Sequence, residues 1–532
     1  MLNLDSSINA SNWYKDTHLH YVFYSSEQKV LHFLKQQISQ LQSFSPKKIA
    51  FKDFYQGFAC LIFDTIKKEC FLIRDHFGFE PFYYTIIDET KQLCFGSTLP
   101  DILTHTINPV LDQQQVESIL TDICIGSLTY TDKTFYKNVW RVTPGQILEL
   151  RCFPHLQCQR YQYWHLIPGT PLIHYSSDED YDAHFASLLE EACFSCCKQA
   201  PDAIAMEFSG GLDTSAILTT LDKLRVSAQL FMHVGEVQDE RCYGEQLLKE
   251  LKTNYPVHYI NADAFDVVAV LNQCKQWFSG GAPYLFFMFA ANIHQAVQCS
   301  GSKILLSGFG GDECVSSHAS LRTWGAQVKC RTLWEELDTA NHQRSNFRQW
   351  VQMLKLRYPY LYYIIQKIKS YRSALARQQA SIHYKPYKSL QERESDWLTG
   401  PLSHHVRMRI EYSAIVAKNM GFTYRYPLLY PPLVEFCFAL PSGQKRRLGK
   451  NRLLMRRYLT KQLSSGLFNQ HRKCGDIFPG TMPKCQALYK DGHLNDELWV
   501  LPYQDIYDDI IKNKWVTDDK LFHVDLLRYM FK

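Results

Sequence analysis

The chain has 532 residues, of which 46% are hydrophobic and 21% charged, and its formal net charge is +5. This length exceeds what one hydrophobic core usually supports, and the composition excludes a disordered chain, so we expect at least two folded domains. The slight net charge gives no general case for nucleic acid as a partner, and no apolar run approaches the ~20 residues of a membrane-spanning helix. Because the N-terminal segment has neither a basic start nor an apolar core, we expect a cytoplasmic enzyme rather than a secreted one.

Short β-like runs dominate the first part of the chain, from about residue 19 to residue 164, and include FACLIFD, ECFLIRD and PFYYTII. Turn signals at Asp75–Gly78 and Pro144–Gly145 separate such runs. The pattern predicts a mostly antiparallel first domain, to which we assign residues 1–170.

A polar stretch at residues 174–182 follows, and the segment after it has the pattern of a helix that carries a CxxC pair, Cys193–Cys196. The chain has seventeen cysteines, but no second pair lies at a zinc-like spacing. Small apolar cysteines in a helix commonly face the core. We therefore interpret the cysteines as reduced structural thiols, with metal ligation as the alternative.

The pattern changes at Ala203–Phe208, a short apolar run suited to a buried strand. Strand-like runs then alternate with helical segments of ten or more residues as far as residues 303–307, which predicts a doubly wound parallel sheet covered on both faces. Beyond Ser317 the chain becomes mostly helical, and residues 318–405 carry no motif with a recognisable chemistry. We therefore expect an α/β domain with a helical C-terminal part over residues 180–532.

The first loop with a recognisable chemistry follows that apolar run and reads Ser209, Gly210, Gly211, Leu212, Asp213, Thr214 and Ser215. Consecutive glycines and a helix N-terminus form an anion cradle, to which the hydroxyl groups add hydrogen-bond donors. An aspartate inside a phosphate cradle would repel the ligand unless a cation lay between them, so Asp213 is predicted to bind Mg²⁺. An ordinary glycine-containing turn from a strand to a helix is the alternative.

A second glycine-rich loop, residues 306–313, follows another strand-like run and contains Gly308, Gly310 and Asp312. Because ligands bind at the carboxyl ends of the strands in a doubly wound sheet, we expect both loops to face the same ligand. Gly308 and Gly310 therefore join the predicted nucleotide site, and Asp312 joins Asp213 as a predicted metal ligand. The interpretation depends on these two carboxylates meeting.

The two loops, SGGLDTS and SGFGGDE, together resemble those of the asparagine synthetase family. The first is similar to the pyrophosphate loop of ATP pyrophosphatases, so the resemblance implies ATP and Mg²⁺ as cofactors and cleavage between the α- and β-phosphates. No GxxxxGK[ST] motif of a kinase-type P-loop occurs in the sequence.

The likeness covers nearly the whole chain. Residues 57–84, and above all Arg74–Gly78, look like the family's glutaminase-type domain, an α+β domain of the Ntn type, and residues 134–150 resemble the segment that closes it. In the C-terminal half, residues 424–441 and 449–459 are similar to the stretch and the helix that follow the synthetase site.

Two predicted catalytic residues depend on this resemblance. His471–Gly475 resembles a loop in which a lysine reaches the nucleotide phosphates, so Lys473 is expected to stabilise the departing pyrophosphate. Glu411 lies sixteen residues before Pro427, where β-lactam synthetases carry the carboxylate of their catalytic dyad, which makes it a candidate base for the attacking amine. A solvated surface lysine and an ordinary helix glutamate are the alternatives.

Three positions depart from the family pattern. Leu2 stands where a working glutaminase has its N-terminal cysteine, and Gly96-Ser97-Thr98 replaces the usual Ala-Ser-Glu, so we expect a degenerate, structural first domain. Phe309 occupies a position that is glutamate in asparagine synthetases and tyrosine in the β-lactam-forming relatives. Phenylalanine does no acid or base work, which disfavours asparagine formation from ammonia and suits packing against a bulky or apolar substrate.

A cluster of basic residues lies in the last quarter of the chain and comprises Lys445, Arg446, Arg447, Lys450, Arg452, Arg456 and Arg457. A solvated helix face is the commonest origin of such a run, so we favour it. Contact with the acidic groups of a peptide substrate, or with nucleic acid, is the alternative.

Together these patterns predict an ATP-dependent ligase that adenylates a carboxylate, releases pyrophosphate and forms an amide. Because no glutaminase is expected, the amine should belong to the substrate itself or to a separate molecule, and intramolecular formation of a lactam or macrolactam, as in β-lactam synthetases or lasso-peptide cyclases, is favoured. An ammonia-dependent asparagine synthetase and an idle scaffold that keeps the nucleotide fold are the alternatives. The expected partner is a small molecule or peptide with a carboxylate and an amine, not a membrane or a nucleic acid.

Overall fold

The structure is a computed structural model of the chain. It describes residues 13–16, 21–25, 32, 51, 54–55, 57–87, 92–106, 109–112, 114–116, 118, 129–151, 157–234, 241–261, 267–279, 290–315, 330–331, 333–334, 353–354, 358, 387, 389–464 and 466–469. Leu2 and Lys473 lie outside these ranges. Among the residues so described, no helix is both long enough and apolar enough to cross a bilayer.

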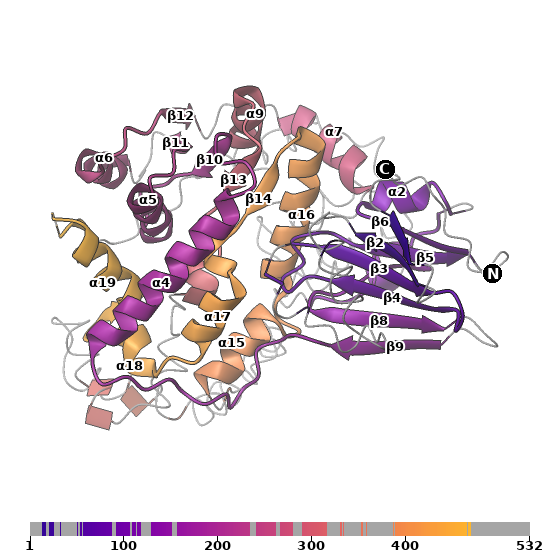
Figure 1. The fold of residues 1–532 in the computed structure, drawn as a ribbon, viewed down its shortest axis with the longest axis horizontal. Helices are drawn as coiled ribbons and strands as arrows, with labels where there is room; N and C mark the ends of the chain where they lie inside the picture. Colours follow the sequence, from indigo (N-terminus) through magenta and orange to yellow (C-terminus); the bar gives the residue numbers. More distant parts are fainter. Residues whose placement is uncertain are drawn as a thin grey trace, which may run out of the picture.

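The first part of the chain forms two antiparallel sheets, as predicted. The larger has the strand order β1-β2-β3-β4-β8-β9, and these strands are Trp13–Asp16, Tyr21–Ser25, Ala59–Asp64, Glu69–Arg74, Gln146–Arg151 and Gln157–Gln162. The smaller has the order β6-β5-β7, and its strands are Gln92–Gly96, Tyr83–Ile87 and Val139–Arg141. Figure 1 shows both sheets at one end of the molecule, with the short helix α2 (Leu99–Leu103) beside β6.

Side chains on both faces of β3 are buried. Leu61 and Phe63 join Tyr84 of the smaller sheet in one apolar cluster, and Cys60 and Ile62 are fully buried as well. Because successive strand residues point to opposite faces, β3 is covered on both sides. Burial raises the pKa of the Cys60 thiol, which therefore stays protonated and serves packing.

The second part of the chain contains the predicted parallel sheet. Its strand order is β12-β11-β10-β13-β14, and these strands are Val257–Asn261, Gln229–Val234, Ile204–Glu207, Ile304–Leu306 and Thr423–Arg425. All four neighbouring pairs are parallel. The edge strand β14 was not predicted, because its three residues are too few to show a strand pattern.

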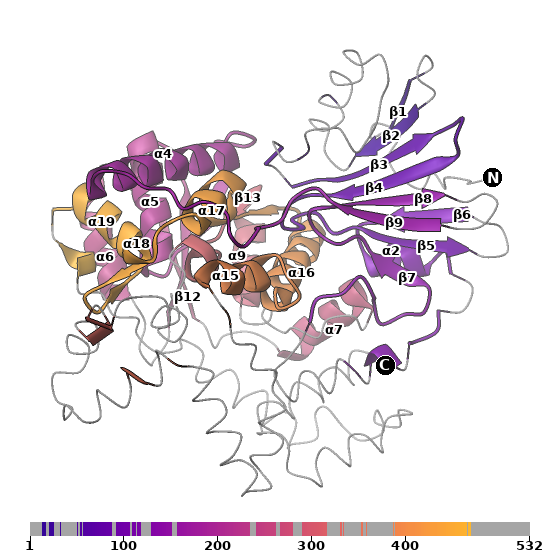
Figure 2. The same cartoon turned by 90° about the horizontal axis from the view of Figure 1, so that it is seen from below.

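Helices lie around this sheet and between it and the first part of the chain (Figures 1 and 2). They comprise α4 (Asp178–Cys197), α5 (Leu212–Leu224), α6 (Arg241–Glu250), α9 (Ala291–Ser300), α15 (Leu390–Leu398), α16 (His404–Met420), α17 (Pro431–Phe438), α18 (Ser442–Lys445), α19 (Leu453–Gln462) and α7 (Val267–Phe278), the last of which contacts α2 and α16. Connections between parallel strands are right-handed, and the chain moves outward from β10 in both directions. The helices α5 and α6 therefore cover one face of the sheet, and α9 and α16 cover the other.

Helix α4 contains the CxxC pair and confirms the helix predicted there. Cys193 lies fully buried beside Phe185 and Leu189 in the main apolar core. Burial raises the pKa of Cys197 to about 12. Both thiols are therefore protonated at neutral pH and contribute to packing.

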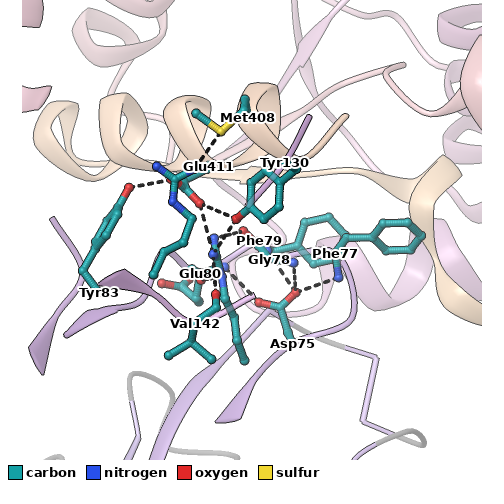
Figure 3. Close-up of polar contacts among 12 residues, drawn as sticks. Asp75, Phe77, Gly78, Phe79, Glu80, Tyr83, Tyr130, Val142, Met408 and Glu411 are labelled. Carbon is teal, nitrogen blue, oxygen red and sulfur yellow. Dashed lines mark hydrogen bonds and ion pairs between the residues drawn. The ribbon is translucent and has the colours of Figure 1, made fainter. Parts of the chain in front are cut away.

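Helix α16 joins the two parts of the molecule through one carboxylate (Figure 3). Glu411 is fully buried, and Arg74 Nη1 donates to its Oε2 atom at 3.0 Å. Tyr83 and Tyr130 each donate a hydroxyl hydrogen bond to the same carboxylate, at 2.6 and 2.9 Å, and Arg141 Nε lies 3.7 Å from Oε1. All four partners belong to the first part of the chain, so this cluster fixes how the two sheet systems meet.

The Arg74–Gly78 motif gives this cluster its local support (Figure 3). The backbone amides of Phe77, Gly78 and Phe79 donate to Asp75 Oδ1 at 3.1, 2.7 and 2.9 Å. The carboxylate closes the turn, and Arg74 Nη2 donates to the carbonyl of Gly78 at 3.0 Å. The motif thus holds the arginine that meets α16, a structural role that needs no glutaminase chemistry.

We expect Glu411→Ala to lower the free energy of unfolding by about 3 to 5 kcal/mol, because it leaves two buried guanidinium groups without their carboxylate. Urea unfolding followed by circular dichroism measures this change. Glu190, which pairs with Lys223 at the surface, provides a matched control. Its replacement by alanine should cost no more than about 1 kcal/mol, and equal losses for both variants would contradict the assigned role.

The same cluster predicts a dependence on pH. Burial alone would raise the pKa of Glu411, but the two arginines and the two tyrosine hydroxyls hold it at about 2, below its ordinary value of 4.5. A depressed pKa in the folded state means that the carboxylate stabilises the fold above pH 4.5 and loses this effect between pH 4.5 and about pH 2. The difference in unfolding free energy between the wild type and Glu411→Gln should therefore shrink over this pH range, and a constant difference would speak against it.

Candidate active site

The two glycine-rich loops begin side by side. Strand β10 pairs with β13 in the register Ile204–Ile304, Ala205–Leu305 and Met206–Leu306, so both strands end at the same edge of the sheet. The chain moves outward from β10 to β11 in one direction and reaches β13 on the other side, which makes this edge a topological switch point. Ligands of doubly wound sheets bind at such points.

The close approach of the loops requires glycine at two positions. A Cβ atom added to Gly308 would lie 2.8 Å from the side chain of Thr214, and one added to Gly311 would lie 1.9 Å from Asp213 Oδ1. Contacts this short do not occur, so any larger residue at Gly311 would displace the aspartate. The glycines of the second loop therefore make room for the first.

The first loop is shaped by its own hydroxyl groups. The amide of Gly211 donates to Ser209 Oγ at 3.1 Å, and the amide of Ser209 donates to Thr214 Oγ1 at 3.3 Å. Helix α5 begins directly after Gly211, and no side chain caps its N-terminus. An uncapped helix N-terminus offers amide donors and partial positive charge, which suits an anion.

Two other residues of the predicted nucleotide site face inward. Leu212 is buried in the main apolar core, and Ser215 is fully buried with its hydroxyl donating to the carbonyl of Gly210 at 3.2 Å. Both therefore stabilise the shape of the loop. Their direct contact with a nucleotide stays a prediction, as does that of Gly310 in the second loop.

The carboxylates of Asp213 and Asp312 meet at one cation, the guanidinium of Arg452. Arg452 Nη1 lies 3.0 Å from Asp312 Oδ1, and Nη2 donates to Asp213 Oδ1. The two carboxylates thus lie against the same single cation. The meeting of the two loops, on which the sequence interpretation depends, is therefore present in the structure.

This pair of carboxylates fits Mg²⁺. Carboxylate oxygens are the ligands that Mg²⁺ prefers, and in nucleotide sites it commonly binds one or two of them together with water and phosphate oxygens. Within the described ranges, no group of three or more histidine, cysteine, aspartate or glutamate side chains is placed to hold a metal ion. Metal binding by Asp213 and Asp312 stays a prediction.

The predicted basic cluster forms a solvated face only in part, because Arg447 and Lys450 are exposed while other members are buried or paired inside the molecule. Lys445 is buried and pairs with Glu394 at 2.6 Å, and Arg457 pairs with Asp182 at 2.6 Å. Arg452 is only 8% exposed. The expectation of a solvated helix face is therefore wrong for these residues, because their acidic partners come from segments far away in the sequence.

Arg409 is a functional candidate that the sequence did not reveal. Its guanidinium carbon lies 4.0 Å from the ring centre of Phe309, a cation–π contact, and Tyr426 packs against the same ring with 6.1 Å between ring centres. Phe309 is buried in this setting. Phe309, the residue that departs from the family pattern, thus lies in contact with Arg409, which brings positive charge to the second loop.

Glu411 points away from this loop. It follows Arg409 by two residues on α16, which is a rotation of about 200° around the helix axis. Arg409 contacts Phe309 on one face, and Glu411 contacts the first part of the chain on the other. This geometry favours a structural role for Glu411. Its role as a base stays a prediction, and it would require the carboxylate to leave its present partners.

A buried polar network lies directly below the two loops. Ser307 Oγ and Tyr424 OH donate to the two oxygens of Glu207, at 2.5 and 2.6 Å. His294 Nε2 lies 2.6 Å from Tyr424 OH, and burial lowers the pKa of His294 to about 3. Because the hydroxyl proton of Tyr424 is donated to Glu207, the Nε2 atom of neutral His294 donates to the Tyr424 hydroxyl oxygen. The network ties the ends of β10, β13 and β14 together beneath the site.

These features define a class of protein, in which a glutamine amidotransferase-like antiparallel domain precedes a parallel α/β domain of the ATP-pyrophosphatase type. The family model of asparagine synthase matches residues 184–479, and that of a glutamine amidotransferase domain matches residues 49–164. The chain therefore belongs to the asparagine synthase family. Both matches fall inside the predicted domain ranges 1–170 and 180–532, whose limits stay predictions.

Curated relatives are distant. Asparagine synthetase [glutamine-hydrolyzing] 2 of Bacillus subtilis is 24% identical over 79% of this chain and 56% of its own length. Amidase chyE of Penicillium rubens is 23% identical over 50% of this chain, and amidase chry2 of Gibberella zeae is 21% identical over 50%, each along 40% of its own length. The chain thus spans about half the length of the curated relatives it matches.

We expect Gly311→Ala to reduce ATP–pyrophosphate exchange by about 100-fold, since displacing an active-site group by ~1 Å costs on this order. The added methyl group would push the Asp213 carboxylate away from its present position. Gly443→Ala is the matched control, because a Cβ atom there meets no atom within 4 Å. Unchanged exchange in Gly311→Ala would show that the position of Asp213 is immaterial.

Proposed function

We propose that the chain is an ATP-dependent ligase that forms carbon–nitrogen amide bonds by way of an acyl-adenylate. One observation carries the proposal: Asp213 and Asp312, from two different loops, meet at the switch point of the sheet. Membership of the asparagine synthase family supports it. The printed names of the relatives, an asparagine synthetase and two amidases, also concern amide nitrogen.

In this proposal the loop Ser209–Ser215 binds the phosphates of ATP through its amides and hydroxyls, with Gly308 and Gly310 at its side. Asp213 and Asp312 hold Mg²⁺, which neutralises phosphate charge when bound. The substrate carboxylate attacks the α-phosphorus, and pyrophosphate leaves with its charge stabilised by Lys473. An amine then attacks the acyl carbon, loses its proton and displaces AMP.

Within this reaction class we favour intramolecular closure of a lactam or macrolactam. Phe309 cannot act as an acid or base, and Arg409, which lies over its ring, places positive charge beside the second loop. Positive charge there suits a substrate that carries an acidic group. Attack by an amine of the same molecule would also profit from proximity. The mechanism does not use Glu411 as a base while its carboxylate remains paired with Arg74.

We expect Asp312→Ala to lower ATP–pyrophosphate exchange by about 100-fold or more, the order seen when a preorganised electrostatic contact is lost from a transition state. Its melting temperature should stay near that of the wild type. Asp202→Ala removes an exposed aspartate just before β10 and should leave exchange unchanged. Retained exchange in Asp312→Ala would remove the metal assignment and the proposed chemistry with it.

The closure reaction predicts a loss of one water, about 18 Da, from a peptide or small molecule produced together with the enzyme. Mass spectrometry of incubations with ATP and no added amine, with ammonia and with glutamine tests this. A mass loss that needs no added amine supports ring closure. Exchange with free aspartate, followed by asparagine formation that depends on ammonia or glutamine, would instead identify an asparagine synthetase.

A further inference from the structure

The guanidinium of Arg452 occupies the space between the two carboxylates that we assign to Mg²⁺. It contacts Asp312 Oδ1 at 3.0 Å through one nitrogen and Asp213 Oδ1 through the other. The side chain is 8% exposed, so this cation is held within the protein rather than at its surface. A guanidinium and a metal ion cannot occupy this position together.

The backbone aims Arg452 at the site. The residue follows a two-stranded hairpin, β15 (Arg446–Arg447) and β16 (Lys450–Asn451), and stands at the N-cap of α19 with φ 58° and ψ 40°. This left-handed conformation is unfavourable for a residue other than glycine, and such strain is concentrated at functional positions. At a position with no role in the site we would expect glycine, which adopts the left-handed conformation without strain.

Helix α19 provides a fixed base for this side chain. Tyr458 and Thr220 share a hydrogen bond of 2.7 Å that joins α19 to α5, the helix that follows the first loop. Both residues are buried. Arg452 therefore stands on the same rigid unit as the phosphate cradle, and a rotation of its long side chain can move the charge without moving the helix.

We propose that Arg452 is an exchangeable counter-ion of this site, which pairs with Asp213 and Asp312 and offsets part of their charge in the nucleotide-free state, and transfers to the triphosphate when Mg²⁺ and ATP bind. The inference rests on the proposed function. The guanidinium fork matches phosphate oxygens as well as carboxylates, so the exchange replaces one hydrogen bond to Asp213 and one ion pair with Asp312 by contacts with phosphate oxygens. The carboxylates released by the arginine then receive the metal ion. The site consequently binds a divalent cation together with the nucleotide and not before it.

The test is a titration with Mn²⁺, a paramagnetic substitute for Mg²⁺, followed by electron paramagnetic resonance without nucleotide. The wild type should bind Mn²⁺ weakly. Arg452→Gln should bind it about tenfold more tightly or better, the size of effect that groups around metal ligands commonly have. Mg²⁺ alone should also raise the melting temperature of Arg452→Gln, whereas the wild type should need Mg²⁺ and α,β-methylene-ATP together.

Two further variants control this experiment. Arg447→Gln removes an arginine of the same hairpin that pairs with Asp178 outside the site, and its Mn²⁺ affinity should equal that of the wild type. Arg452→Lys keeps the charge but lacks the fork that reaches both carboxylates, so its affinity for Mn²⁺ should be intermediate, and it serves if Arg452→Gln does not fold. Equal Mn²⁺ affinity in the wild type and the Arg452 variants would overturn the inference.

The proposed function is judged separately in the same assay. With α,β-methylene-ATP present, Asp312→Asn in the wild-type background should lose Mn²⁺ binding. If it does, the metal assignment stands even where the Arg452 variants bind Mn²⁺ no better than the wild type. If Asp312→Asn keeps its Mn²⁺, the metal assignment itself fails, and the exchange of counter-ions fails with it.

Discussion

The parallel pairing of β10 with β13 is the constraint on which the candidate site depends. Their register brings Met206 opposite Leu306. The loops that follow β10 and β13 therefore leave the sheet at the same edge and at the same level along the strands. The loops can then approach until Gly311 touches the carboxylate of Asp213. Two aspartates this close repel each other unless a cation lies between them. The sheet topology therefore places two negative charges where a cation stabilises them, and in this structure the cation is Arg452.

Helix α16 is one of the connections between this site and the first domain. Helix α16 carries Arg409 on the face toward the second loop and Glu411 on the face toward Arg74. The cluster around Glu411 is buried, so the loss of one partner would leave an uncompensated charge inside the protein. The first domain thus has a structural role that is independent of glutaminase chemistry, because it supplies residues that hold α16 against the synthetase-type domain.

Charged residues that are neighbours in sequence serve different partners in the fold. Between residues 445 and 457 the basic side chains reach Glu394, Asp178, Asp182 and the aspartate pair of the site. Each pairing draws on an acidic residue from a distant segment. Part of a dense run of positive charge in the sequence therefore becomes internal counter-ions, Lys445 and Arg452 among them, while Arg447 and Lys450 stay exposed.

The sequence by itself determined the classes of element and the kind of site. Short β-like runs separated by turn signals predicted the antiparallel part, and strand-like runs alternating with helical segments predicted the parallel sheet. The loops Ser209–Ser215 and 306–313 indicated a nucleotide site, because glycine-rich turns are local signals. Only the tertiary structure decided what those residues meet. The pairing of Arg452 with Asp213 and Asp312, the contact of Arg409 with Phe309 and the enclosure of Glu411 by Arg74 join residues 100 or more positions apart. Such contacts depend on how the strands order themselves and how the helices pack, and neither leaves a local pattern in the chain.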